Sequence, residues 1–246
     1  MSDQRKEASI SGAGMISGGT YDQVSISGAG KITGDIHAEE LRISGAGKAK
    51  GKVEATKIVV SGSVSFADDV IADEMRISGS AHVDGRITAK ELKSSGSLKV
   101  ARNVSSDYIK ISGSLRAGAD VETEIFRASG GFQIDGLLSA DRIEIRIGGR
   151  CQAKEIGGEQ IDIRRGGSRE KGIILDGLIK LFTGGGTPGL ETTQIEGDEI
   201  YLEDTAADVV RGKRVKIGPG CRIKMVEYHE SLKAHPDAKI DKQMKV

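Results

Sequence analysis

The sequence predicts an all-β fold, a single-stranded β-helix (β-solenoid) of about 12 coils, each seventeen to eighteen residues long. The first observation is a tripeptide, Ser-Gly-Ser or a close variant, that returns at a constant interval of seventeen in the numbering. The second is a composition with 35 glycines but only 3 prolines, 4 Phe, 4 Tyr and no Trp, which indicates an aliphatic core with tight, ordered corners. The central glycines of the tripeptides are Gly28, Gly45, Gly62, Gly79, Gly96, Gly113 and Gly130.

Between two tripeptides, apolar residues alternate with polar ones over short runs. In one repeat they are Val64, Phe66, Val70, Met75 and Ile77, and charged residues occupy several of the positions between. Pairs two residues apart indicate short strands, and the longer gaps indicate corners. One such coil cannot bury its own inner face, so we expect successive coils to stack and to hydrogen-bond to one another. The unequal spacings suit a right-handed helix better than the strict six-residue rank of left-handed ones, although a left-handed helix with a shortened face would give a similar pattern.

The tripeptide itself is expected to mark a corner of each coil. A glycine with an unusual φ angle would sit there beside small side chains, stacked coil on coil. We therefore interpret the seven glycines as structural corner residues and assign no catalytic role to the serines beside them.

The pattern divides the chain into segments. We expect a disordered tail over residues 1–8, a β-helix over residues 9–228, and a tail or end cap over residues 229–246. The β-helix is regular over residues 9–147 and irregular over residues 148–228, where coils gain an extra residue and a Gly/Pro-rich loop is expected at 183–193. The irregular part has apolar positions at Ile156, Ile161, Ile163, Ile174, Ile179, Leu181, Ile195, Ile200, Leu202, Val210, Val215 and Ile217.

No motif predicts catalysis, a cofactor or a metal. The glycines at 184–186 are not followed by the Lys-Ser or Lys-Thr of a phosphate-binding loop, and His229-Glu230 lacks the second His of a zinc motif. An acidic run in a late coil is interpreted as a solvated face, with a cation or partner site as the alternative. This run comprises Glu196, Asp198, Glu199, Glu203, Asp204 and Asp208.

The charge balance, the N-terminus and the cysteine count bear on possible partners and on the cellular compartment. Lys plus Arg and Asp plus Glu both number 36, so the net charge predicts no attraction of the whole molecule to nucleic acid. The N-terminus has no apolar signal-peptide core, and no stretch is long and apolar enough to span a membrane. Cys151 and Cys221 are too few for a disulfide framework and are interpreted as reduced thiols of a cytoplasmic protein.

Three elements resemble the coils of bactofilins. They are residues 32–45 (ITGDIHAEELRISG), residues 83–92 (VDGRITAKEL) and residues 215–223 (VKIGPGCRI), and the resemblance extends over about residues 9–228. Bactofilins are bacterial cytoskeletal proteins with a right-handed, roughly triangular β-helix. The resemblance implies assembly without nucleotide, end to end through the terminal coils, into filaments that scaffold cell-envelope, morphogenesis or motility proteins. A paralogous bactofilin is a further candidate partner, and recruitment to the inner face of the cell membrane would go through partners. The chain lacks the short apolar N-terminal segment of several members, so direct membrane insertion is not expected.

The ends of a solenoid expose unpaired backbone groups and an open core. We expect Met15, Val24 and Ile26 to form the N-terminal assembly face, and Ile217, Ile223, Val226 and Tyr228 the C-terminal one. The alternative function is a β-solenoid binding module for a surface, glycan or protein ligand, monomeric or oligomeric. The mixed charges at outward positions disfavour it. An enzyme is the least favoured class, and its most plausible cleft would lie at the 183–193 loop beside the acidic run.

Overall fold

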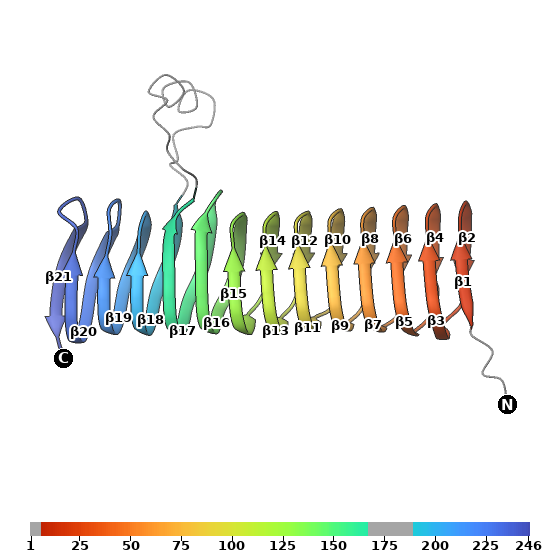
Figure 1. The fold of residues 1–246 in the computed structure, drawn as a ribbon, viewed down its shortest axis with the longest axis horizontal. Helices are drawn as coiled ribbons and strands as arrows, with labels where there is room; N and C mark the ends of the chain where they lie inside the picture. The colour runs from red at the N-terminus through yellow and green to blue at the C-terminus, as the bar shows by residue number, and fades with distance from the viewer. Residues whose placement is uncertain (1–5, 167–188) are drawn as a thin grey trace, which may run out of the picture.

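A computed structural model describes residues 6–166 and 189–246, and over these residues every regular element is a β-strand. The strands form a parallel β-solenoid of about 13 turns, which confirms the predicted all-β fold. Figure 1 shows a straight rod of stacked coils, with β1 and β21 at opposite ends. The predicted right-handedness and triangular cross-section stay predictions.

Each coil of the regular part contributes one short strand and one long strand. The first coil has two short strands, β1 (Glu7–Ile10) and β2 (Ala13–Ile16). The later short strands are β4 (Ala29–Ile32), β6 (Ala46–Ala49), β8 (Ser63–Phe66), β10 (Ser80–Val83), β12 (Ser97–Val100) and β14 (Ser114–Ala117). The long strands are β3 (Gly19–Ile26), β5 (Ile36–Ile43), β7 (Val53–Val60), β9 (Val70–Ile77), β11 (Ile87–Ser94), β13 (Val104–Ile111) and β15 (Val121–Ala128).

In the irregular part the short and long strands merge. These strands are β16 (Gly131–Ile147), β17 (Cys151–Arg165), β18 (Leu190–Leu202), β19 (Thr205–Ile217), β20 (Arg222–Ala234) and β21 (Lys239–Lys245).

The parallel pairing places equivalent positions of successive coils on top of one another. From β3 to β16 each residue lies opposite the one seventeen positions further along the chain, as in Val104 opposite Val121. Inward positions therefore form aliphatic columns along the rod, and nearly all of their side chains are buried. One column breaks the pattern, because Ser94 is buried between Ile77 and Ile111 and its hydroxyl has no hydrogen-bond partner.

The long strand bends once in every regular coil. In the pairing of β13 with β15, Ser106 lies opposite Thr123 and Tyr108 opposite Ile125, while the residue between them is left out of the ladder. The Ser106 hydroxyl lies 3.1 Å from each of the carbonyl oxygens of Lys90 and Tyr108, to which it donates. A buried hydroxyl thus satisfies backbone acceptors near the point where the ladder is interrupted.

The expectation of an unusual φ at the tripeptide glycines is wrong. Among the described glycines only Gly19 and Gly220 have a positive φ. The requirement is instead steric: a Cβ on Gly79 would lie well under 3.0 Å from the carbonyl oxygen of Gly62 directly below it. The same oxygen accepts a hydrogen bond from the Ser80 amide at 2.8 Å, so the two coils cannot move apart without losing that bond.

A second corner, which the sequence analysis did not single out, is held by aspartates. Asp35 Oδ1 accepts a hydrogen bond from the Lys52 amide of the next coil at 2.9 Å, and Asp69 Oδ1 does the same for Arg86. A glycine, Gly51, precedes Lys52, and a Cβ at that position would collide with the Asp35 carboxylate. This corner is thus closed by a side chain rather than by a backbone ladder alone.

The register loosens after β15, as the sequence predicts. Arg142 lies opposite Gln160, one residue more than the regular step, and Leu190 lies opposite Thr205, two residues fewer. At the junction, β17 pairs directly with β18, with Ile161 opposite Ile200. The expected coil positions Ile174, Ile179 and Leu181, and the expected loop up to residue 188, lie outside the described residues; residues 190–193 belong to β18.

The chain beyond residue 228 adds one more coil to the rod. β20 continues to Ala234, and β21 pairs with it in parallel, with Ile223 opposite Ile240. At the other end, β1 begins at Glu7 and pairs with β3. The division into tail, β-helix and cap stays a prediction. Strands lie on both sides of its limits, because β1 begins before residue 9 and β20 and β21 extend beyond residue 228.

Candidate functional site

The N-terminal end of the rod is formed by β1 and β2. Met15 lies on it and is 72 % exposed. Val24 and Ile26 lie one coil deeper, because Ala8 and Ile10 of β1 are stacked on them, and both are buried. Of the three residues expected to form this assembly face, only Met15 is therefore accessible.

The C-terminal end is formed by β21 instead of β20. Ile223 and Val226 are buried beneath Ile240 and Gln243 of β21, and Ile217 lies beneath Ala234. Tyr228 is partly buried and packs against the core, with Lys245 opposite it in β21. The four residues expected on this face are thus covered, and a charge at Val226 would disrupt the core rather than an interface.

The residues that stand at the ends were missed by sequence reasoning, although a signal for them exists. Ile10-Ser11-Gly12-Ala13 repeats Ile26-Ser27-Gly28-Ala29 at a spacing one shorter than the regular interval, so a search at a fixed period skips it. At the far end, Ile240 follows Ile223 at the regular interval and is half-buried, and Met244 is 41 % exposed. Polar residues around these two positions concealed the strand.

Most of the acidic run of the late coils is paired with cations of other coils. Asp198 pairs with Lys213 at 2.8 Å, and Glu199 pairs with Arg214. Asp208 pairs with Lys224 at 2.7 Å. These partners raise the pKa values of Lys213, Arg214 and Lys224 through hydrogen bonds and Coulomb attraction. No group of three or more His, Cys, Asp or Glu residues suited to a metal ion occurs among residues 6–166 and 189–246.

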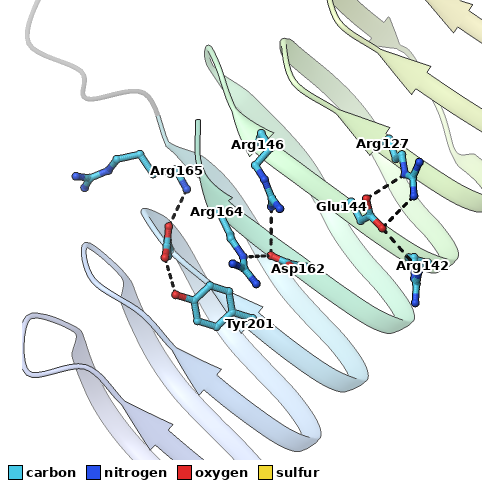
Figure 2. Close-up of polar contacts among 9 residues, drawn as sticks. Arg127, Arg142, Glu144, Arg146, Asp162, Arg164, Arg165 and Tyr201 are labelled. Carbon is cyan, nitrogen blue, oxygen red and sulfur yellow. Dashed lines mark hydrogen bonds and ion pairs between the residues drawn. The ribbon is translucent and has the colours of Figure 1, made fainter. Parts of the chain in front are cut away.

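Cross-coil ion pairs continue this pattern toward the junction of β17 and β18. Figure 2 shows Glu144 between Arg127 and Arg142, and Asp162 between Arg146 and Arg164. Each carboxylate thereby joins side chains of two successive coils. Exposed pairs of this kind stabilise by only about 0–1 kcal/mol each, so they serve mainly to fix the alignment of the coils.

At the junction itself a denser cluster joins β17 to the following coils. Arg165 forms a bidentate ion pair with Asp204, with an Nη2–Oδ1 distance of 2.6 Å. The Arg165 amide donates to Glu203 at 2.9 Å, and Glu203 also accepts from the Tyr201 hydroxyl at 2.5 Å (Figure 2). That bond to a carboxylate raises the pKa of Tyr201 to about 12. The arrangement is typical of a structural clamp where the ladder passes from β17 to β18.

A hollow of about 730 Å³ lies beside this region. Gly157, Gly158, Gly197 and Gly212 line it together with Leu137. Gly158 and Gly197 are required by close stacking, because a Cβ on either would collide with the carbonyl oxygen one coil below. Two of its charged residues, Asp198 and Lys213, are paired to each other, and Arg211 is paired with Glu227; Glu155, Glu159 and Glu196 also line it. The hollow is therefore explained by stacking, and its lining shows no nucleophile held beside a general base.

The two cysteines are buried in the core and unpaired with each other. Burial raises the pKa of each thiol to about 11. The Cys151 thiol donates to the Gly130 carbonyl at 3.6 Å, and the Cys221 thiol to the Leu202 carbonyl at 3.4 Å. Such thiols are inert packing groups rather than nucleophiles. Over the same described residues there is no helix long and apolar enough to cross a bilayer.

The N-terminal coils match a known protein family. Residues 8–98 match the family model "Bactofilin: Polymer-forming cytoskeletal". This confirms the predicted resemblance over these residues, while the strand ladder continues past the end of the match. The family is described as cytoskeletal and polymer-forming, not as enzymatic, and its description implies self-association.

Two relatives from Bacillus subtilis strain 168 are similar to part of the chain. The uncharacterised protein YhbF is 38 % identical over 96 residues, which is 38 % of this chain and 34 % of the relative. The uncharacterised protein YhbE is 37 % identical over 98 residues, which is 40 % of this chain and 38 % of the relative. The match thus spans little more than a third of either relative. No solved structure matches the chain.

Proposed function

We propose that the chain, whose residues 8–98 match the bactofilin family model, is a structural cytoskeletal protein that assembles end to end, without nucleotide, through its terminal coils. The filaments or oligomers would scaffold cell-envelope, morphogenesis or motility proteins on the cytoplasmic side of the cell membrane. A paralogous bactofilin would be a second building block. These partners and this location are proposed by family resemblance.

The observation that carries the proposal is the open ladder at each end of the rod. β1 pairs only with β3, β2 pairs only with β4, and β21 pairs only with β20. Each of these strands leaves one edge of backbone donors and acceptors without a strand partner among the described residues. Such edges are templates for pairing with another chain. A second copy stacked on an end would continue the ladder of the rod.

The side chains at the ends support this arrangement. Met15 is the most exposed large apolar residue of the described chain, and it stands on β2 beside Ile16 at the outer end of the core. At the other end, Ile240 packs against the core and Met244 is exposed. A docked copy would cover Ile240 and part of the Met15 and Met244 side chains, which stand in the outward rows of Lys31 and Glu227. Each Å² of apolar surface removed from water contributes about 25 cal/mol.

The test is sedimentation and negative-stain microscopy of the purified full chain at physiological salt, with and without added ATP or GTP. We expect filaments or end-to-end oligomers in both cases. A strictly monomeric, dispersed protein would overturn the proposal, and assembly only with nucleotide would overturn its mechanism.

Variants locate the contact. Met15→Glu and Met244→Glu place a charge at either end, and we expect each to shorten the assemblies and the double variant to leave single rods. Leu137→Glu is the matched control, because Leu137 is 38 % exposed but lies in the middle of the rod. Assembly that tolerates both end variants would move the contact away from the ends.

A further inference from the structure

The charges on the outside of the rod are sorted by edge. Along the corner that carries the tripeptides, no Asp or Glu lies within three residues of any of the seven glycines from Gly28 to Gly130. Cations stand instead on one or both flanks of most of them, on the short strand that follows and at the end of the long strand that precedes. These cations are Lys31, Arg42, Lys48, Arg76, Lys93, Lys99, Lys110, Arg116 and Arg127. We call this the basic edge.

The bend of the long strand carries the opposite charge. The residue left out of the ladder is acidic in most regular coils: Asp22, Glu39, Asp73, Asp107, Glu124 and Asp141, with Thr56 and Lys90 as exceptions. We call this the acidic edge. The part of the long strand after the bend separates the two edges, so one chain presents both to its surroundings.

Part of each edge has no ion-pair partner within the chain. Lys48, Lys99 and Lys110 are exposed on the basic edge and form no salt bridge with any described residue. Glu39 and Glu124 are exposed and equally unpaired on the acidic edge. Asp107 and Asp141 are also exposed and form no salt bridge with any described residue.

The remaining corner is different, because its charges alternate and cancel. Asp35, Lys52, Asp69 and Arg86 follow one another there, and Arg86 pairs with Asp69 at 3.0 Å. Stacked rows of like charge raise the energy of an isolated rod, since side chains of one sign repeat at about 4.8 Å. Two rows of opposite sign with the same period fit each other on neighbouring rods.

We infer that the basic edge of one copy of this chain docks against the acidic edge of a second copy, so that rods associate side by side. Because both rows have the same period of one coil, the cations and carboxylates that face each other stay in step along the contact, apart from the coils that lack one of them. The contact is heterologous, because it joins two different surfaces. A docked pair of rods therefore keeps one free basic edge and one free acidic edge, and further rods can add to form bundles or sheets. The inference rests on the proposed self-assembly but concerns the sides of the rod rather than its ends.

Salt dependence provides the first test. The Debye length is about 30 Å at about 0.01 M salt and about 3 Å at about 1 M, so exposed charges attract strongly only in the first condition. We expect bundles of rods by microscopy and light scattering at low salt, and single filaments of unchanged length at high salt. Filaments that bundle equally at both concentrations would overturn the inference.

Charge reversal gives the sharper test. Lys99→Glu/Lys110→Glu reverses two neighbouring charges on the basic edge, and Asp107→Lys/Glu124→Lys reverses two neighbouring charges on the acidic edge. We expect each variant alone to bundle about tenfold less at low salt, and an equimolar mixture to bundle again because opposite edges are restored. Lys50→Glu/Arg102→Glu is the control for the first variant, since it makes the same change of net charge at the remaining corner, and it should bundle as the parent does.

The outcomes separate the two proposals. Variants that still form single filaments confirm end-to-end assembly while lateral contact is lost. If the parent forms no filaments, end-to-end assembly is wrong, and lateral pairing is still read from the salt-dependent sedimentation of single rods. A mixture that fails to bundle overturns the lateral contact. So does a parent that disperses at low salt but pellets with phosphatidylserine vesicles or with DNA through Lys99 and Lys110, because the partner is then a polyanion.

Discussion

A glycine-to-alanine substitution at the tripeptide corner tests the stacking directly. In the rod, the Gly79 amide donates to the Val60 carbonyl at 3.3 Å, and the Ser78 and Ser80 amides donate to Val60 and Gly62 at 2.8 Å. A methyl group at position 79 would collide with the Gly62 oxygen. The coils must then separate at this corner, which breaks two or three hydrogen bonds at about 0.5–1.5 kcal/mol each.

We therefore expect Gly79→Ala to lower the free energy of unfolding by about 2–4 kcal/mol. Gly12→Ala is the matched control, because Gly12 holds the same position in the first coil and a Cβ there meets nothing within 4 Å. Its cost should be close to zero. The two variants differ only in whether a coil lies below the substituted glycine.

The measurement is guanidinium unfolding followed by far-UV circular dichroism, with amide hydrogen exchange to locate the change. Stacked repeats can unfold in parts. A lower slope of the unfolding free energy against denaturant concentration, together with a lower midpoint concentration, would therefore indicate that the rod breaks at the substituted coil. If Gly79→Ala is as stable as Gly12→Ala, the close approach of the coils does not explain the glycine repeat.

Two further predictions concern the core. Ser94→Val should raise the free energy of unfolding by about 1–3 kcal/mol, because it removes a buried hydroxyl without a partner and fills a column occupied by Ile77 and Ile111; a lower denaturation midpoint would contradict this. Cys151 and Cys221, whose pKa is raised to about 11 from an ordinary 9.0, bind more protons when folded, so stability should be full below about pH 9 and decline from pH 9 to 11. Alanine at both positions should flatten that decline in pH-dependent unfolding, and an unchanged decline would contradict the assignment.

The period of the sequence was sufficient to predict the stacked coils, because a solenoid repeats one local rule. It was insufficient at the ends. Ile10 lies at a spacing one shorter than the regular interval, and Ile240 lies on a strand that follows a turn. The outward positions of both strands are mostly polar, so the sequence analysis interpreted these covering strands as tails. Val24 and Val226 were consequently placed on the surface when they are buried.

The role of the glycines shows another limit. A glycine repeat reports that a side chain is excluded, but it does not report whether the cause is a φ angle or a neighbouring carbonyl. Only the registered contact of Gly79 with Gly62 distinguishes the two. The sorted charges were visible in the sequence from the start. Their meaning required knowing that Lys110 and Glu124 lie on different edges of the same coil stack.

Because the regular coils stack in one constant register, the number of coils sets the length of the rod. Because Ile77, Gly79 and Ser80 each have an equivalent in the next coil, removing or duplicating one full repeat between β3 and β15 returns the same corners in the same order. The rod would change by one coil, about 4.8 Å, while both terminal strands stay intact. The spacing between successive ends in an assembly is therefore adjustable in whole coils, by duplication of short stretches of coding sequence, without redesign of a contact.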